Sequence, residues 1–202
     1  MLAEMPVTEI TLNELSRRVG LAKSNVLRYF ESREAVLLEL LDSMWQEWLA
    51  DLEEELGRAV NGNASPIERA GQLAAALANS LASRPALCDL IGAQAAVLER
   101  NVSPQVAAGY KWATLGNVAA LGHVARGCIG ELGERDSFQL AGTAMMMTGA
   151  LWPHTQPSAA MLAAYQTDPA LAASRLDFTA TMREVVEVLI AGLLARSGSR
   201  AL

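Results

Sequence analysis

The sequence has few of the residues from which catalytic and metal sites are usually built. Its 202 residues include two histidines and two cysteines. The histidines, His123 and His154, have no carboxylate at metal-ligand spacing, the cysteines form no Cys-x-x-Cys pair, and there is no nucleophile elbow or Gly-rich phosphate loop. We therefore expect no catalytic residue, no metal ligand and no cofactor, and an enzyme is the minor alternative. Cys88 and Cys128 lie in apolar helical patterns, which is typical of reduced core thiols.

Long apolar runs are also missing. No stretch reaches the roughly 18 apolar residues that a membrane-spanning helix needs, and the N-terminus lacks the basic start and apolar core of a secretory signal. We therefore expect a cytoplasmic protein with no membrane partner. Runs of β-branched residues are scarce, whereas Ala and Leu recur in nearly every segment and hydrophobic residues make up 51% of the chain. This composition favours helix throughout and predicts an all-α protein.

Charge is distributed unevenly along the chain. The formal net charge is −6, yet the stretch from Thr11 to Arg33 carries five basic and two acidic residues. The basic residues are Arg17, Arg18, Lys23, Arg28 and Arg33, and the acidic residues are Glu14 and Glu31. A basic patch on an acidic protein is typical of phosphate binding on one face. The alternative for the same residues is a satellite helical hairpin with a solvated polar face.

The same stretch has the spacing of a helix-turn-helix. Leu12, Leu15 and Val19 fall on one face of a short helix, and Gly20 follows as the residue best able to end it. After a three-residue turn, a second short helix is predicted over Lys23–Phe30. A pair of short helices joined by such a turn is the unit that places one helix in the major groove of DNA.

One run of residues resembles a known family at this point. The matching residues are Thr11, Leu15, Ser16, Gly20, Leu21, Ala22, Lys23, Val26, Tyr29, Phe30, Ser32, Arg33, Glu34, Val36 and Leu37. With them the segment is similar to the DNA-reading part of the TetR family of bacterial transcriptional repressors. In that family a helix of about four turns precedes this point, so we expect the first helix to be largely missing from this chain, whose start has only Met1–Glu4 before Met5-Pro6.

The resemblance implies two domains and a division of roles. Residues 1–45 would form the helix-turn-helix DNA-binding domain, and residues 46–202 an effector-binding and dimerisation domain, joined through a long helix over 33–58. The residues implied to face bases are Lys23, Ser24, Asn25 and Leu27, with Arg28 able to contact bases or phosphates; those implied to hold phosphates are Thr11, Asn13, Tyr29 and Arg33. Asn25 can both donate to and accept from a base edge, and Leu27 can contact a thymine methyl. The implied partner is double-stranded operator DNA.

Capping residues and prolines divide the rest of the chain into helices. Ser65-Pro66-Ile67-Glu68 is a capping box that predicts a helix reaching Ser83. Further helices are predicted from Ala86 to Asn101, from Ser103-Pro104 to Gly130, from Asp136 or Ser137 to Leu151, from Ser158 to Gln166, and from Asp177 onward. The segment Trp152–Pro157 is predicted to interrupt the helix that begins at Asp136 or Ser137.

Composition at the centre of this region favours a mostly apolar pocket for a small hydrophobic effector. A Gly-rich helix is followed by three methionines, and glycines leave room while methionines adapt to varied shapes. The candidate ligand-binding residues are Tyr110, Trp112, Asn117, His123, Met146 and Trp152. The alternative is that these residues merely fill a core.

The last helix has a wide apolar stripe, which is typical of a helix that is either central to a core or half of an interface. We predict a homodimer in which this helix and the one over Phe138–Leu151 form a four-helix bundle with their symmetry mates, and in which Val185→Glu with Leu189→Glu yields monomer. The function predicted overall is a ligand-responsive transcriptional repressor released from its operator by the effector. A helical ligand-binding or scaffolding dimer that does not bind DNA is the alternative, and a gel-shift separates the two.

Overall fold

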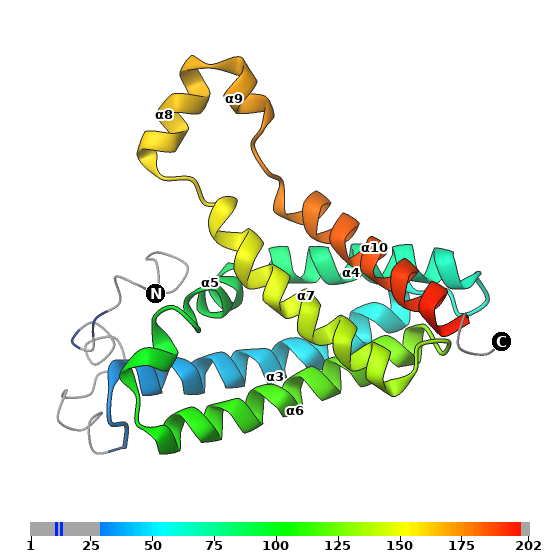
Figure 1. Ribbon diagram of the computed structural model, residues 1–202, viewed down its shortest axis with the longest axis horizontal. Coiled ribbons are helices and arrows are strands. Elements are labelled where there is room, and N and C mark those ends of the chain that lie inside the picture. Colours follow the sequence, from blue (N-terminus) through cyan, green and yellow to red (C-terminus); the bar gives the residue numbers. More distant parts are fainter. Residues whose placement is uncertain (1–10, 12, 14–28, 199–202) are drawn as a thin grey trace.

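The computed structural model describes Thr11, Asn13 and residues 29–198 of the chain. Every regular element within these residues is a helix, so the all-α prediction is confirmed (Figure 1). The elements are α3 (Arg33–Ala59), α4 (Pro66–Ala82), α5 (Pro85–Ala93), the 3-10 turn η2 (Leu98–Asn101), α6 (Pro104–Cys128), α7 (Glu134–His154), α8 (Ala159–Thr167), α9 (Pro169–Ala173) and α10 (Phe178–Gly198). None of the described helices is long and apolar enough to cross a bilayer.

Side-chain caps set several of the helix starts. The Ser32 hydroxyl accepts the Ala35 N–H at 3.1 Å and begins α3, the long helix that the sequence predicted. Ser65 and Glu68 form the predicted capping box at the start of α4. Ser103 and Ser158 accept N–H groups in the same way at the starts of α6 and α8. These starts could be read locally because each cap uses residues within one turn.

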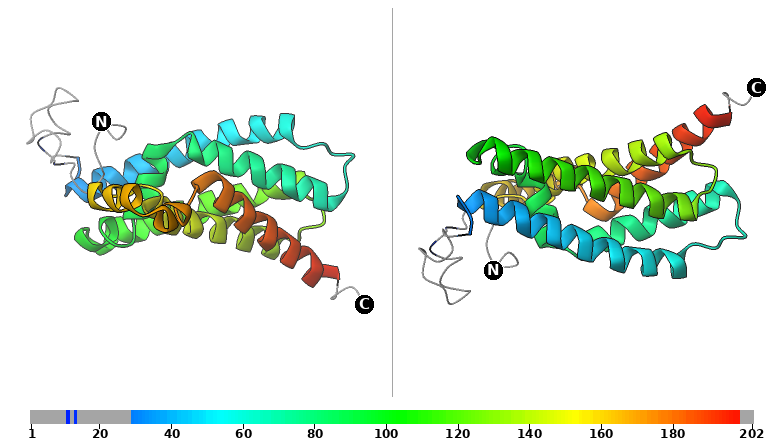
Figure 2. Two further views of the ribbon diagram at one scale, coloured as in Figure 1. Left: turned by 90° about the horizontal axis from the view of Figure 1, so that it is seen from above. Right: turned by 90° about the horizontal axis from the view of Figure 1, so that it is seen from below.

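The helices pack as a bundle whose long members lie side by side. α3 packs against α6, α6 against α7, and α10 against both α4 and α7, while α5 lies against α7 and α3. Views from above and below show α3 and α6 along the length of the molecule and α10 diverging towards the C-terminal end (Figure 2). A centre of leucines and alanines from α3, α4, α6 and α7 holds these layers together, and the space left inside it is about 10 Å³.

One glycine of α6 accounts for the close approach of α6 and α7. A Cβ added to Gly122 would meet the Ser137 carbonyl oxygen at 3.1 Å and the Phe138 nitrogen at 3.2 Å. Any side chain here would therefore push the backbones apart. The neighbouring glycines Gly109, Gly116 and Gly127 face open space, so close packing explains the Gly-rich character of α6 only at Gly122.

The predicted helix from Ala86 to Asn101 is wrong, because two separate elements occupy this range. α5 ends at Ala93, and η2 follows a short turn. Leu98 is fully buried, and the side chain of Gln94 accepts the Tyr110 hydroxyl. These tertiary contacts stabilise the turn at the expense of a continuous helix.

The predicted limits of the helix from Asp136 or Ser137 to Leu151 are also wrong. α7 begins with Gly133 at its N-cap, so Asp136 and Ser137 lie inside the first turns and are buried. It continues through Trp152 and Pro153 to His154. Trp152 is held in the helix by burial, by its ring contact with Phe178 at a centroid distance of 5.1 Å, and by a hydrogen bond described below.

Candidate effector site at the start of α3

The structure describes four of the nine residues predicted to contact DNA. Thr11 and Asn13 are exposed, the Tyr29 side chain is 81% exposed, and Arg33 is half-buried. Lys23, Ser24, Asn25, Leu27 and Arg28 lie outside the described residues. Tyr29 and Arg33 stand where the chain enters α3, and the DNA contacts remain a prediction.

Arg33 has an intramolecular partner that the sequence reading did not assign. Its Nε and Nη2 donate to Glu34 Oε1 at 3.2 and 2.9 Å. Both side chains are largely shielded, with exposed fractions of 20% and 14%. The charge that Arg33 would present to a phosphate is therefore partly neutralised by its neighbour.

A cavity of about 460 Å³ lies at the same end, between the start of α3 and the first half of α6. Its described lining consists of Tyr29, Phe30, Glu31, Ala35, Leu38, Glu39, Asp42, Val106, Gly109, Tyr110 and Ala113. Tyr29 and Phe30 are the last residues of the second helix, Lys23–Phe30, of the predicted DNA-reading segment. A molecule in this cavity would thus touch that segment, the connecting helix and α6 together.

The lining combines apolar walls with acidic groups. Glu31, Glu39 and Asp42 are carboxylates, and no described lining residue is basic. Two of the carboxylates also tie the walls together: Glu31 Oε1 accepts the Ser103 N–H at 2.5 Å, and Asp42 Oδ1 accepts the Asn117 amide at 2.6 Å. Such a lining favours ligands that bring hydrogen-bond donors or positive charge.

Tyr110 is the buried tyrosine of the cavity wall. Its hydroxyl donates to Gln94 Oε1 at 2.8 Å, and the side chain is buried. Burial raises the pKa of Tyr110 to about 12, so the phenol stays neutral at physiological pH. Sequence reasoning selected Tyr110 but missed the carboxylates of α3. The signal that could have found Glu39 and Asp42 is their three- and four-residue spacing with Ala35 and Leu38, which places all four on one side of α3.

The other predicted ligand residues do not join Tyr110 in one enclosed pocket. Asn117 reaches the cavity edge through Asp42, whereas Trp112, His123 and Met146 are exposed and line none of the cavities described here. The exposed fractions of Trp112 and Met146 are 75% and 70%. α6 and α7 turn these three side chains away from the closed leucine centre, and their part in a ligand site stays a prediction.

Trp152 belongs to a second, smaller cavity. Its indole N–H donates to Asp89 Oδ1 at 2.6 Å, and burial raises the pKa of that carboxyl. The cavity, about 320 Å³, lies at the base of the α8–α9 excursion and is lined by Trp152, Thr155, Gln156, Arg175, Leu176, Asp177 and Phe178. In the described residues, no group of three or more His, Cys, Asp or Glu is placed to hold a metal.

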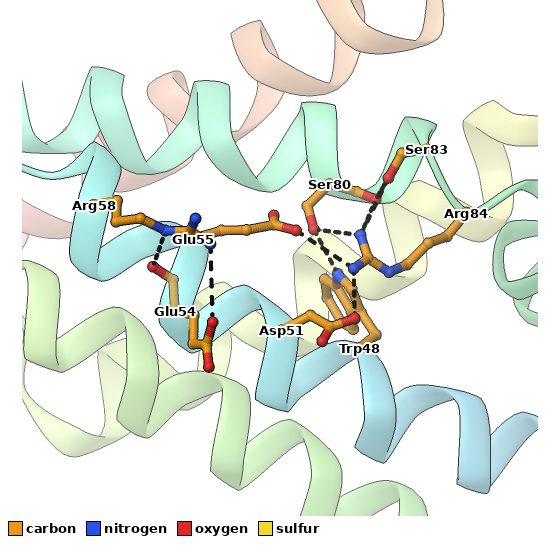
Figure 3. A network of polar contacts seen from close by, with 8 residues as sticks. All are labelled: Trp48, Asp51, Glu54, Glu55, Arg58, Ser80, Ser83 and Arg84. Atoms are coloured by element: carbon orange, nitrogen blue, oxygen red, sulfur yellow. Dashed lines mark hydrogen bonds and ion pairs between the residues drawn. The ribbon is translucent and has the colours of Figure 1, made fainter.

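A polar network fixes the second half of α3 (Figure 3). The Trp48 indole N–H donates to the Ser80 hydroxyl at 3.1 Å. Arg84 donates to Ser80 Oγ at 2.9 Å and to Asp51 Oδ2 at 2.9 Å, and it lies 3.4 Å from Glu55. These bonds join α3 to the end of α4 and the turn before α5, so this part of α3 is held while its start borders an open cavity.

Comparison with known proteins places the chain in a family. The family model described as the tetracyclin repressor-like C-terminal domain matches residues 42–197. The chain belongs to the TetR family. The resemblance at the helix-turn-helix is therefore confirmed at the level of the family, and the match covers the part of the chain that follows it.

Solved structures of TetR-family regulators share the fold at low sequence identity. A TetR transcriptional regulator from Rhodococcus sp. RHA1 has a TM-score of 0.59 and 13% identity over 96% of this chain and 88% of that one. FadR of Bacillus halodurans, a fatty acid degradation regulator, has a TM-score of 0.56 and 16% identity over 92% and 89%. FadR of Bacillus subtilis, in complex with stearoyl-CoA, has a TM-score of 0.55 and 15% identity over 92% and 89%.

No curated protein matches the sequence significantly. Membership of the TetR family makes this chain a ligand-responsive transcriptional regulator, and the similar structures named above are regulators as well.

Proposed function

We propose that this chain is a dimeric repressor released from its operator when a small effector fills the cavity between α3 and α6. The observation that carries the proposal is the position of the cavity. It touches Tyr29 and Phe30, which end the second helix of the predicted DNA-reading segment, and it touches α6 on the opposite wall. A ligand that holds α3 and α6 in one arrangement would thereby bias the position of the reading segment.

α3 is suited to confine such a change to its start, next to the reading segment. It has 27 residues, so it is about 40 Å long. Its second half is fixed by the Trp48–Ser80–Arg84 network and by the closed leucine centre. A shift at the start of the helix is therefore taken up by the start alone. A tenfold change in DNA affinity requires about 1.4 kcal/mol of coupling.

The lining defines the effector more closely than the sequence did. Phe30, Leu38 and Val106 favour an apolar body, as predicted for a small hydrophobic effector. Three carboxylates without a described basic residue favour a donor or a cationic group on that body. The stearoyl-CoA bound by FadR of Bacillus subtilis carries phosphates, which this lining would repel.

Two substitutions on α3 test this assignment. Glu39 lines the cavity, while Glu47 is exposed and lies outside its described lining. After thermal-shift screening of cationic amphiphiles, Glu39→Gln is expected to weaken the tightest binder about fivefold or more, since about 1 kcal/mol of charge attraction is lost. Glu47→Gln is the matched control and should leave affinity unchanged. Equal affinity in both variants would contradict the assigned site.

Operator binding is proposed to use the residues carried over from the family motif. Gel-shifts with the DNA upstream of the protein's own gene test it against the alternative of a dimer that binds no DNA. Arg33→Ala should weaken all sequences alike and lessen the salt slope by about one unit. Asn25→Ala should instead change the preference among sequences. Equal loss of specificity from both would contradict the division of roles.

The dimer is proposed to form through the outward faces of α7 and α10. The exposed residues of α10 are two charged ones, Arg183 and Glu184, and a set of small or apolar ones: Ala180, Val188, Ala191, Gly192 and Ala195. Val188 is 67% exposed, whereas Leu189 packs against its own core, so Val188 is the better position to disrupt than the Val185 and Leu189 pair. Val188→Glu with Ala191→Glu should sediment as monomer. A pair of subunits spans half-sites about 34 Å apart.

A further inference from the structure

A helical hairpin leaves the bundle between α7 and α10. It comprises residues 158–176 with α8 and α9, which pack against each other (Figure 1). No residue of either helix is buried. The hairpin thus gains little from the body of its own subunit, although its two ends join the helices of the proposed dimer face.

The composition of this hairpin is not that of a solvated surface. From Ser158 to Leu176 only Asp168 and Arg175 are charged. Its exposed apolar side chains are Met161, Leu162, Leu171 and Leu176. A helical pair with so few charges and several exposed large side chains is typical of a segment that packs against another surface.

A matching surface lies on α6. Ala108, Trp112, Leu115 and Ala119 recur at three- and four-residue spacing and are all exposed; we call them the α6 stripe. Beside them, Gly116 has open space where a Cβ would stand. A tryptophan that is 75% exposed among alanines and a glycine offers both apolar area and room for a second helix to come close.

The symmetry required for operator binding brings these two surfaces together. Both reading segments must face the same DNA, so the two-fold axis must run along the molecule towards the start of α3. Figure 1 shows the hairpin and α6 on opposite sides of α7, with the hairpin and the first half of α6 both towards that same end. A half-turn about this axis exchanges the sides, so the partner's hairpin arrives on the side of α6.

We propose that the α8–α9 hairpin of each subunit packs on the α6 stripe of its partner. This inference rests on the proposed dimer, and it assigns the hairpin to a second copy of the chain rather than to another protein. The hairpin then contacts the partner next to the proposed effector cavity, because α6 carries both the α6 stripe and the cavity residue Tyr110. Effector response and subunit contact would be linked through one helix.

Tryptophan quenching measures the contact in the intact protein. All four tryptophans lie in the described part of the chain; Trp45, Trp48 and Trp152 are buried and Trp112 is exposed. In the wild-type dimer, acrylamide is expected to quench little of the emission because the hairpin shields Trp112. Met161→Asp with Leu171→Asp should raise quenching to the level of the Val188→Glu, Ala191→Glu monomer. Trp112→Phe is the control that removes the increase.

Cross-linking between differently tagged copies identifies the neighbour. With Cys128→Ala to remove the accessible thiol, Leu171→Cys in one copy should cross-link to Leu115→Cys in the other. The control is Ile67→Cys, an exposed position on α4. Cross-linking to Ile67→Cys instead, or quenching that is unchanged by the hairpin substitutions in a dimer, would overturn the hairpin proposal alone. A wild-type protein that sediments as monomer would overturn the dimer as well.

Discussion

The first and second halves of α3 differ in what surrounds them. The first half borders a cavity of about 460 Å³ with three carboxylates in its wall. The second half faces a leucine centre with about 10 Å³ of free space, and it is tied to α4 by the network around Ser80. Close packing resists deformation, whereas an open cavity can be filled or closed at little cost. The second half of α3 is thus held in place, whereas its first half borders free space.

Truncating a leucine in each half should give the largest difference between them. Leu52 faces the closed centre, and Leu38 lines the open cavity. Both side chains are buried, but Leu52→Ala should lower the free energy of unfolding by about 4 kcal/mol and Leu38→Ala by about 2 kcal/mol, since the wall around Leu38 borders open space and can relax more freely. Urea denaturation measures both. Equal costs would mean that the two halves are packed alike.

Removing the central hydroxyl of the network should have the next largest effect. Ser80→Ala leaves the buried Trp48 N–H without its acceptor and takes one bond from Arg84, so stability should fall by about 2 kcal/mol. Ser83→Ala removes two other bonds of the network, but at an exposed position where water can replace them, so stability should fall by only about 0.5 kcal/mol. A Ser80→Ala protein as stable as wild type would show that the network does not hold α3.

These features were not equally visible in the sequence. Capping boxes and Ser-Pro starts were read correctly because each depends on residues within one turn. The end of α5 and the continuation of α7 through Pro153 were not, since they depend on contacts with distant residues such as Tyr110 and Phe178. Apolar character gave no means of telling a buried side chain from an exposed one, so Trp112 and Met146 were predicted for a pocket although both are exposed.

The two cysteines offer a smaller test of the same contrast between closed and open packing. Burial raises the pKa of the Cys88 thiol to about 12, and it also raises that of the half-buried Cys128. Because the thiolate is the reactive form, a disulfide reagent at about pH 8 should modify Cys128 in the native protein and Cys88 only on unfolding. Equal reaction rates would contradict the closed packing around Cys88.

The same shift predicts an alkaline limit to stability. A raised pKa means that the folded state holds the proton more tightly than the unfolded state. The contribution of Cys88 is therefore fully present below its ordinary value of 9.0 and falls as the pH rises from there towards about 12. Urea titrations across that range should show the decline, and Cys88→Ala should flatten it. A decline of equal steepness in the variant would assign the effect elsewhere.

Filling the cavity at the start of α3 should have the smallest effect on the free energy of unfolding among these variants, and it should remove the response to ligand. Ala113 is a half-buried residue of α6 that lines the cavity. Ala113→Leu should alter the free energy of unfolding by less than about 1 kcal/mol because free space is available for the added atoms. Ligands that raise the melting temperature of the wild type should no longer do so. A retained shift would place the ligand in another cavity.

The most direct experiment measures whether a ligand in this cavity changes the affinity for operator DNA. Fluorescence anisotropy of labelled upstream DNA, at one fixed salt concentration, gives the operator Kd with and without the tightest ligand found by thermal shift. Saturating ligand is expected to raise the Kd of the wild type about tenfold or more, which corresponds to about 1.4 kcal/mol of coupling, and to leave that of Ala113→Leu unchanged. A ligand that binds in this cavity and leaves the wild-type Kd as it was would contradict this coupling.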